Sequence, residues 1–561
     1  MEPLKPLNSY HGPKGPVVLL IMDGVGVGRY AEGDFVRAAA TPNMHWLREH
    51  ALYTELKAHG KAVGMPSDDD MGNSEIGHNA IGCGRVFDQG ASLVSKAISS
   101  GALFEGETWK GLVHNCRAHE SALHFIGLFS DGNVHSHIDH LEAMLRRAKE
   151  EGVKKARVHI LLDGRDVPPT SALVYVDRLE AFLKDLNADG SVDFRIASGG
   201  GRMKITMDRY EADWDMVKRG WNIHVRGEGP MFAGAREAIE SLRQQNPGAI
   251  DQDLPPFVIA RDGKPVGAIQ SCDSVIFFNF RGDRAIEISR AFEEESFDKF
   301  DRGPRPDVYY AGMMQYDGDT KIPKKFLVPP PGIDRTVGEY LTTTDVRQMA
   351  ISETQKFGHV TYFFNGNRSG KFDEALEDYV EVPSDRVSFE ERPWMKAAEI
   401  TDKVVTAVLR KKRKYPFIRL NYANGDMVGH TGVVDAVRIA VEAVDLCLGR
   451  VIKAVREVGG ILVVTADHGN SDDMYEHDKK SGAVMVDSAT GVPKAKTSHS
   501  LNPVPCYIYD PSGVSKARLA AGAAVTEKGP GFGISSLAAT CIKLLGYEPP
   551  SDYTPSIVDV G

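Results

Sequence analysis

The sequence is poor in cysteine and has no long apolar run. Its six cysteines stand far apart, without a CxxC pair, so neither a disulfide framework nor a thiolate zinc site is predicted. No stretch of about 18 uninterrupted apolar residues occurs that would span a bilayer. The N-terminal "MEPLKPLNSYHGPKGP" lacks the charged-then-apolar build of a secretory signal. We therefore expect no membrane partner and a reducing, cytoplasmic location.

Basic residues are fewer than acidic residues. The chain has 67 Lys and Arg against 77 Asp and Glu, a formal net charge of −10, which repels nucleic acid and argues against such a partner. Hydrophobic residues (42%) and charged residues (26%) occur in the proportions of an ordinary globular protein. Because 561 residues exceed one hydrophobic core, roughly two to four domains are expected.

Three apolar runs end in acidic residues. "VVLLIM" leads to Asp23, "FIRLNYANGD" ends at Asp426, and "ILVVTADHGN" contains Asp467. In open α/β sheets, functional groups gather at the carboxyl ends of parallel strands. We expect the three carboxylates to converge at one crevice although they are far apart in sequence.

A middle segment repeats the strand-then-loop pattern at 122–137, 157–171, 194–203 and 274–285, with helical spacing between the strands. It reads as a second α/β unit. Its expected borders are near 88–90 and at the proline-rich "LVPPPG", residues 327–332. The predicted fold is thus a discontinuous α/β domain, residues 1–88 and 333–561, into which a second α/β domain with its hinges, residues 89–332, is inserted.

Carboxylates and imidazoles recur together. "GDMVGH" separates Asp426 and His430 by four positions, "ADHGN" holds Asp467 and His468, and "TSHS" adds His499. Such mixed ligands suit manganese, cobalt or zinc better than calcium. With Asp23 they make six candidate ligands, enough for two metals about 3.5–4 Å apart, as used in phosphoryl transfer. Taken singly, each Asp/His pair is more often a helix cap or a satisfied core histidine than a metal site.

Ser74 lies in the glycine-flanked stretch "MGNSEIGHNAIGCGR". A metal would lower the pKa of its hydroxyl and hold it in line with a phosphorus atom, which makes Ser74 a candidate nucleophile. The alternative is a simple helix N-cap, because Ser74 precedes "EIGHNAIG". The two roles are compatible, since a helix N-terminus is itself an anion site.

Arginines follow the predicted strands of the middle segment. They suit bidentate binding of carboxylates and phosphates, so the set predicts a small, doubly anionic substrate. His135 in "DGNVHSH" adds a donor or general acid. A single loop arginine is more often a surface ion pair, and that alternative stays open for each. The set is Arg165, Arg202, Arg209, Arg281 and Arg284.

Together these stretches resemble the cofactor-independent phosphoglycerate mutases of the alkaline phosphatase superfamily. In chain order, the resemblance is carried by "LLIMDGVG", "MGNSEIGHNAIGCGR", "FSDGNVHSHIDH", "LLDGRDVPPTSA", "SGGGRMKITMDR", "FFNFRGDRA", "ISETQKFGHVTYFFNG", "NYANGDMVGHTG", "VVTADHGN" and "TSHS". They span residues 17 to 501.

The resemblance implies an alkaline-phosphatase-like, metal-binding domain and an inserted transferase domain. One divalent metal would take Asp426, His430 and His499, and the other Asp23, Ser74, Asp467 and His468. Manganese or cobalt is expected first, with zinc or magnesium as alternatives. The implied substrate contacts are His135, Arg165, Asp166, Arg202, Arg209, Arg281, Arg284 and Lys356.

The implied reaction interconverts 3-phosphoglycerate and 2-phosphoglycerate through a phosphoserine at Ser74, without a bisphosphate cofactor, in a monomer. The nearest competitors are a phosphatase or phosphopentomutase of the same superfamily and a silent phospho-ligand-binding protein. A plain hydrolase would not need the arginine-rich insertion, pentomutases attack with threonine, and a binding module needs no nucleophile.

Overall fold

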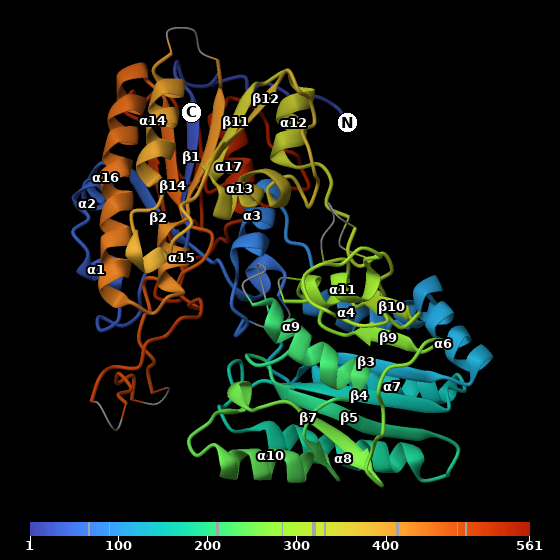
Figure 1. The fold of residues 1–561 in the computed structure, drawn as a ribbon. Coiled ribbons are helices and arrows are strands. Elements are labelled where there is room, and N and C mark those ends of the chain that lie inside the picture. Colours follow the sequence, from blue (N-terminus) through green and yellow to red (C-terminus); the bar gives the residue numbers. More distant parts are fainter. Residues whose placement is uncertain are drawn as a thin grey trace. The chain divides into compact units, whose positions relative to one another are not determined.

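The computed structural model describes residues 1–65, 68–88, 90–208, 213–282, 284–316, 321–329, 332–410, 414–478, 481–487 and 491–561. The chain forms two compact units: unit 1 is Met1–Gln89 with Gly332–Gly561, and unit 2 is Gly90–Pro331. At the two predicted borders, Gln89, Pro330 and Pro331 lie outside the described residues. Each unit has its own sheet, helices and core (Figure 1), which confirms the predicted α/β class.

Unit 1 is built on a seven-stranded sheet of order β12-β11-β13-β1-β14-β15-β2. Its central strand β1 pairs in parallel with β13 on one side and β14 on the other, and all three are fully buried. Burial on both faces explains why they read as nearly continuous apolar runs. The strands are β1 (Val17–Met22), β2 (Leu52–Leu56), β11 (Gln348–Glu353), β12 (Glu377–Val382), β13 (Phe417–Tyr422), β14 (Ile461–Thr465) and β15 (Val504–Tyr509).

Helices pack on this sheet, and the longest of them, α16, contacts both α14 and β14. Its buried residues recur every three to four positions, as expected for an amphipathic helix against a core. A separate pair of short strands is β16 (Arg518–Leu519) and β17 (Val558–Asp559). The helices of unit 1 are α1 (Phe35–Ala38), α2 (Pro42–His50), η1 (Gly60–Val63), α3 (Ser74–Cys83), α12 (Val337–Thr343), α13 (Thr354–Gly358), η4 (His359–Phe363), η5 (Phe389–Glu391), α14 (Ala397–Val408), α15 (Asn424–Gly429), α16 (Val434–Val458) and α17 (Ser536–Leu544).

Unit 2 has an eight-stranded sheet of order β10-β9-β3-β4-β5-β7-β6, with β8 beside β7. Strands β9, β3, β4 and β5 are parallel neighbours, so their carboxyl ends lie at one edge. The strands are β3 (Ala122–Phe129), β4 (Lys155–Leu162), β5 (Asp193–Gly201), β6 (Met231–Phe232), β7 (Phe257–Arg261), β8 (Lys264–Pro265), β9 (Ser274–Phe277) and β10 (Tyr309–Gly312).

Two apolar clusters fill unit 2. Buried residues of α7, α8 and α10 belong to one, and those of α9 and α11 to the other, while β3 supplies alternate residues to each. The helices are α4 (Gly90–Ser99), α5 (Ala102–Glu105), α6 (Glu107–His119), α7 (Ile138–Glu150), α8 (Ala172–Asn187), α9 (Trp214–Trp221), η2 (Asn222–Arg226), α10 (Ala235–Gln245), η3 (Asp251–Asp253) and α11 (Ile286–Glu293).

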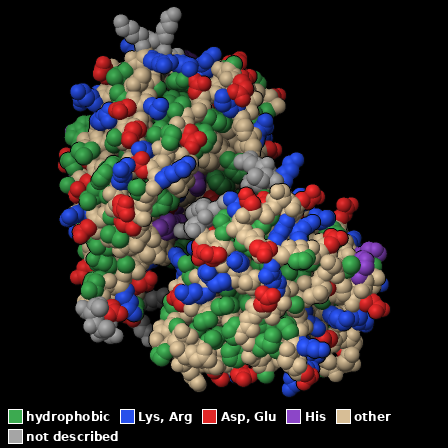
Figure 2. Space-filling model, in the orientation of Figure 1, with side chains coloured by type: hydrophobic (Ala, Val, Ile, Leu, Met, Phe, Trp, Pro, Cys, Tyr) green, Lys and Arg blue, Asp and Glu red, His purple; other side chains and the backbone are tan. Residues whose placement is uncertain are grey.

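Acidic and basic side chains are interspersed over the face of both units shown in Figure 2. Such mixing is typical of a surface that meets water. Among the described residues, no helix combines the length and the apolar character that crossing a membrane requires.

Gly82 on α3 tests how closely this helix packs. A β-carbon there would lie 1.9 Å from the Phe364 carbonyl oxygen, whereas one at Gly358 on α13 would meet nothing within 4 Å. We expect Gly82→Ala to lower the free energy of unfolding by about 1–3 kcal/mol because it overpacks the contact. Gly358→Ala should leave it unchanged or raise it by about 0.4–1 kcal/mol. Urea unfolding compares the two, and equal stabilities would contradict the close approach.

Candidate active site

Ser74 is the first residue of α3, and the cap of that helix is its neighbour. The Asn73 side chain accepts a hydrogen bond from the Ile76 amide at 2.9 Å. The interpretation of Ser74 as the N-cap is therefore wrong, because Asn73 satisfies the helix end. The buried Ser74 hydroxyl instead lies 2.8 Å from His468 Nε2 and donates to Asp23 Oδ1 at 3.1 Å.

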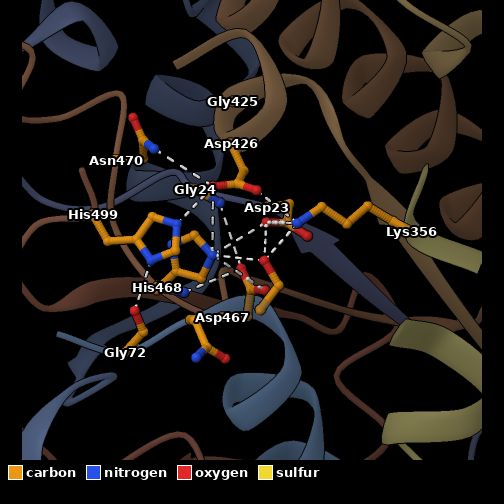
Figure 3. Close-up of polar contacts among 12 residues, drawn as sticks. Asp23, Gly24, Gly72, Lys356, Gly425, Asp426, Asp467, His468, Asn470 and His499 are labelled. Carbon is orange, nitrogen blue, oxygen red and sulfur yellow. Dashed lines mark hydrogen bonds and ion pairs between the residues drawn. The ribbon is translucent and has the colours of Figure 1, made fainter. Parts of the chain in front are cut away.

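The three acidic residues expected at one edge do meet there. Asp23 directly follows β1, Asp426 lies in α15 after β13, and Asp467 and His468 follow β14. His468 Nε2 lies 3.4 Å from Asp23 Oδ1, 3.7 Å from Asp426 Oδ1 and 3.8 Å from Asp467 Oδ2 (Figure 3). The parallel register of the three strands produces this convergence.

Two histidines from loops and helix ends complete one side of the cluster. His430 Nε2 and His499 Nε2 lie 3.1 Å apart, and each is 3.1 Å from Asp426 Oδ1. Their Nδ1 atoms lie 2.7 Å from the carbonyl oxygens of Thr497 and Gly72, respectively. A carbonyl only accepts, so Nδ1 carries a proton, and in a neutral imidazole Nε2 then presents a lone pair. Two lone pairs and a carboxylate oxygen facing one another suit a bound cation.

A second group is buried deeper. Asp467 Oδ2 accepts no hydrogen bond from any described residue, although His78 Nδ1 lies 3.2 Å away. A buried carboxylate oxygen in this state is costly unless a cation compensates it. Asp467 belongs with Asp23 and His78 to one group of potential ligands, and Asp23 joins Asp426 and His468 in another. Carboxylates and imidazoles are the donors that a further divalent ion would use. The residues present therefore fit bound divalent metal.

Lys356 stands among these carboxylates. Its ammonium lies 2.5 Å from Ser74 Oγ, 2.7 Å from Asp426 Oδ2 and 3.2 Å from Asp23 Oδ1 (Figure 3). Burial alone would lower the pKa of Lys356, but the charges of Asp23 and Asp426 raise it well above its usual range. Lys356, expected from the resemblance as a substrate contact, therefore lies beside the candidate nucleophile in unit 1.

The other expected substrate residues that the structure describes lie at the carboxyl edge of the unit 2 sheet. Buried Arg202 follows β5 and donates from Nη1 to Asp163 Oδ1 at 2.9 Å and to Asp166 Oδ2. Arg284, after β9, donates to the Met207 carbonyl at 2.6 Å. His135 follows β3, Arg165 follows β4 and Arg281 follows β9. Arg209 lies outside the described residues.

Known proteins resemble the chain over nearly its whole length. A family model described as "BPG-independent PGAM N-terminus" matches residues 94–318. A "Probable 2,3-bisphosphoglycerate-independent phosphoglycerate mutase" from Leptospira interrogans is 54% identical over 544 residues, 97% of each chain. The 2,3-bisphosphoglycerate-independent phosphoglycerate mutase of Trypanosoma brucei brucei is 51% identical, over 98% of each chain.

A solved structure agrees with these relatives. That of Leishmania mexicana phosphoglycerate mutase, at low cobalt concentration, is 48% identical, covers 100% of both chains and superimposes with a TM-score of 0.83. This chain belongs to the 2,3-bisphosphoglycerate-independent phosphoglycerate mutase family. The resemblance drawn from the motifs is confirmed.

Sequence reasoning missed two buried residues of this mutase-family site, His78 and Asn421. Asn421 Nδ2 donates to Asp23 Oδ2 at 2.7 Å and lies 3.2 Å from His78 Nε2. His78 Nδ1 lies 2.8 Å from the Ser74 carbonyl oxygen. Two signals pointed to them: Asn421 is a polar residue in an apolar strand, and His78 lies one helical turn after Ser74.

Protonation of His468 makes metal binding at this site measurable as a release of protons. Burial lowers its pKa, but Asp467 and Asp23 raise it to about 10, so His468 carries a proton at about pH 8. An imidazole must lose that proton to bind a metal. We expect metal added to the metal-free mutase at about pH 8 to release roughly one more proton per chain in the wild type than in His468→Gln. A pH indicator in weak buffer measures the release, and equal release would contradict the assignment.

The raised pKa of His468 also makes the free energy of unfolding depend on pH. The folded pKa lies above the unfolded value of about 6.5, so protonated His468 stabilises the metal-free fold fully below about pH 6.5. This contribution is lost as the pH rises toward about 10. The difference in unfolding free energy between the metal-free wild type and His468→Gln should shrink over that range.

Proposed function

We propose that the chain interconverts 3-phosphoglycerate and 2-phosphoglycerate through a phosphoserine at Ser74, without a bisphosphoglycerate cofactor, in glycolysis and gluconeogenesis. One observation carries the proposal. Ser74 Oγ, buried among candidate metal ligands, is faced by the Lys356 ammonium at 2.5 Å and by Asp23 Oδ1 at 3.1 Å. A hydroxyl with a cation on its oxygen and an acceptor on its proton is prepared to act as a nucleophile. The names of the relatives support the same reaction.

In the first half-reaction Ser74 Oγ attacks phosphorus, and the bond from phosphorus to the C3 oxygen breaks. Asp23 Oδ1 receives the hydrogen bond of the hydroxyl proton, and overall that proton ends on the C3 oxygen of glycerate. Lys356 Nζ faces Ser74 Oγ and stabilises the negative charge that this oxygen gains as it gives up its proton. The second half reverses these steps with the C2 hydroxyl as the attacking group.

Two divalent ions complete the proposal. One would be held by Asp426, His430 and His499, the other by Asp23, Ser74, Asp467 and His468. When bound, such ions lower the pKa of a coordinated hydroxyl and offset the charge of a phosphoryl group. Manganese or cobalt is proposed first, zinc or magnesium as alternatives. Two observations support both sites: His430 Nε2 and His499 Nε2 face each other, and Asp467 Oδ2 accepts no hydrogen bond from any described residue.

Each unit then has a role. Unit 1 is the metal-binding, phosphatase-like domain, and unit 2 is the transferase domain that retains glycerate between the two half-reactions. Arginine forks suit a carboxylate bidentately, and buried Arg202 is pre-ordered by Asp163 and Asp166. Lys356 would contact the phosphoryl group. The residues that would bind glycerate are His135, Arg165, Asp166, Arg202, Arg209, Arg281 and Arg284. We further propose a cytoplasmic monomer, which the free thiols of all six cysteines support for a reducing compartment.

Activity should depend on metal and fall with pH. The ligands are carboxylates and histidines, which bind only when deprotonated, so protons compete with the ions. We expect exhaustive chelation to abolish turnover of 3-phosphoglycerate, and manganese or cobalt to restore it. Elemental analysis verifies the metal content. Full activity in verified metal-free protein would contradict the two-metal assignment.

Ser74→Ala should abolish the mutase reaction while metal and substrate still bind. Loss of a nucleophile costs more than about a thousandfold in kcat, whereas the fold loses one hydroxyl. Ser536→Ala is the control, because it removes a buried hydroxyl of unit 1 that has no partner among the described residues. The assay measures 2-phosphoglycerate and free phosphate formed from labelled 3-phosphoglycerate without bisphosphate. Residual mutase activity in Ser74→Ala would refute the phosphoserine route.

Arg284→Ala should change the product ratio. Losing one arm of the anion clamp weakens retention of glycerate, so water hydrolyses more of the phosphoserine. The same assay should show more free phosphate relative to 2-phosphoglycerate. An unchanged ratio would remove Arg284 from the clamp, and free phosphate as the sole wild-type product would identify a phosphatase instead.

A further inference from the structure

Six polar residues form a continuous chain of hydrogen bonds inside unit 2, here called the buried chain. Each is at most 5% exposed. Asp273 precedes β9, His124 lies in β3, His159 in β4, Ser198 in β5, His224 in η2, and Thr206 follows β5. The contacts are Asp273 Oδ2 to His124 Nε2 (3.0 Å), His124 Nδ1 to His159 Nε2 (2.9 Å), His159 Nδ1 to Ser198 Oγ (2.7 Å), Ser198 Oγ to His224 Nδ1 (2.8 Å) and His224 Nε2 to Thr206 Oγ1 (3.0 Å).

An irregularity in the sheet makes the chain continuous. Val158 lies opposite Ile196, but the next residue of β4, His159, lies opposite Ser198, so Ala197 is an extra residue in β5. A regular register would place Ala197 opposite His159. The bulge therefore brings a hydroxyl to the position where His159 Nδ1 needs a partner.

The direction of every hydrogen bond follows from Asp273. Its carboxylate already accepts from the amides of Ala122 at 2.8 Å and Gln270 at 2.7 Å, which identifies it as an acceptor. His124 must then donate from Nε2, and its Nδ1 accepts from His159 Nε2. The same logic continues to the far end, where Ser198 donates to His159, His224 Nδ1 donates to Ser198, and the Thr206 hydroxyl donates to His224 Nε2.

This assignment requires three neutral imidazoles. Burial lowers the pKa of each, and that of His224 falls to about 3. The Arg157 guanidinium on β4 lowers the pKa values of His124 and His159 further, whereas Asp273 raises that of His124 without reversing the shift. With every imidazole neutral, each nitrogen has one role, and all protons point toward Asp273.

The far end of the chain reaches the anion-binding edge. Thr206 has a φ of 65°, a left-handed backbone that is strained for a β-branched residue. Its side chain is closely packed, since a β-carbon at Gly220 on α9 would lie 2.0 Å from Thr206 Oγ1. The next residue, Met207, uses its carbonyl to accept the 2.6 Å hydrogen bond from Arg284 Nη1. The Thr206 side chain is thus one peptide away from a group that orients Arg284.

We propose that the buried chain is a positioning device: it holds Thr206 in its strained conformation through His224 and so places the Met207 carbonyl that orients Arg284 for the substrate anion. The inference rests on the proposed function only in assigning Arg284 to that anion. Thr206 and His224 are positioning residues, because they act through Arg284 and touch no reacting atom.

Nitrogen NMR of the histidine-labelled wild type tests the direction of the chain. We expect three neutral imidazoles at about pH 7, protonated on Nε2 in His124 and His159 and on Nδ1 in His224. Single His→Gln variants assign the signals. Thr206→Val should shift the His224 signals, whereas Thr401→Val, which removes an equally buried hydroxyl in unit 1, should not. A proton on His224 Nε2, or a cationic imidazole at any of the three positions, would overturn the proposal.

Kinetics test the positioning role. Thr206→Val keeps the shape of the side chain but loses the hydroxyl, and Thr206→Ser keeps the hydroxyl. We expect Thr206→Val to raise KM for 3-phosphoglycerate by about tenfold with kcat changed less than about threefold, since binding rather than chemistry is weakened. Thr206→Ser and Thr401→Val should stay within about twofold of the wild type. Equal KM values for the Val and Ser variants would overturn the role of the hydroxyl.

Calorimetric binding of 3-phosphoglycerate separates the two ways of failing. If the wild type binds without turnover and Thr206→Val still weakens binding, the proposed function fails and the positioning role is supported. If the wild type turns over and Thr206→Val binds as tightly as Thr206→Ser, the positioning role fails and the proposed function stands. Arg284→Ala with wild-type affinity would likewise overturn the coupling to the anion.

Discussion

The parallel alignment of β13, β1 and β14 is the constraint on which the site depends. It directs Asp23, Asp426 and Asp467 to one buried edge, where three carboxylates repel one another in a poorly solvated space. Such a concentration of charge needs cations. In the chain alone Lys356 and protonated His468 supply them, and the same requirement makes the edge suitable for divalent ions.

Unit 2 also places charged side chains at the carboxyl ends of parallel strands, but there the charges are positive. Its parallel strands β9, β4 and β5 carry arginines just beyond their carboxyl ends, and β3 carries His135, where unit 1 carries carboxylates. Arg202 is buried and held by Asp163 and Asp166, so its guanidinium is already desolvated and ordered. In the function that we propose, the edge of unit 1 accepts the phosphoryl group and the edge of unit 2 keeps glycerate.

Buried polar groups stabilise a fold only when all of their partners are present. The chain from Asp273 to Thr206 meets that condition through an extra residue in β5, whereas an apolar core at the same place would need no such irregularity. Beneath Ser74, Asn421 and His78 link Asp23 to the start of α3.

The sequence by itself determined the α/β class, the family and the strand ends that carry Asp23, Asp426 and Asp467, because apolar runs and their terminal residues are local patterns. Tertiary structure decided what those patterns leave open. It brought Lys356 to Ser74 and joined Asn421 to His78, whereas the choice of Asn73 over Ser74 as the cap of α3 is a local contact with Ile76. The contacts of Lys356 and Asn421 depend on which segments pack together across hundreds of residues. A local pattern does not record a contact whose partner lies elsewhere in the chain.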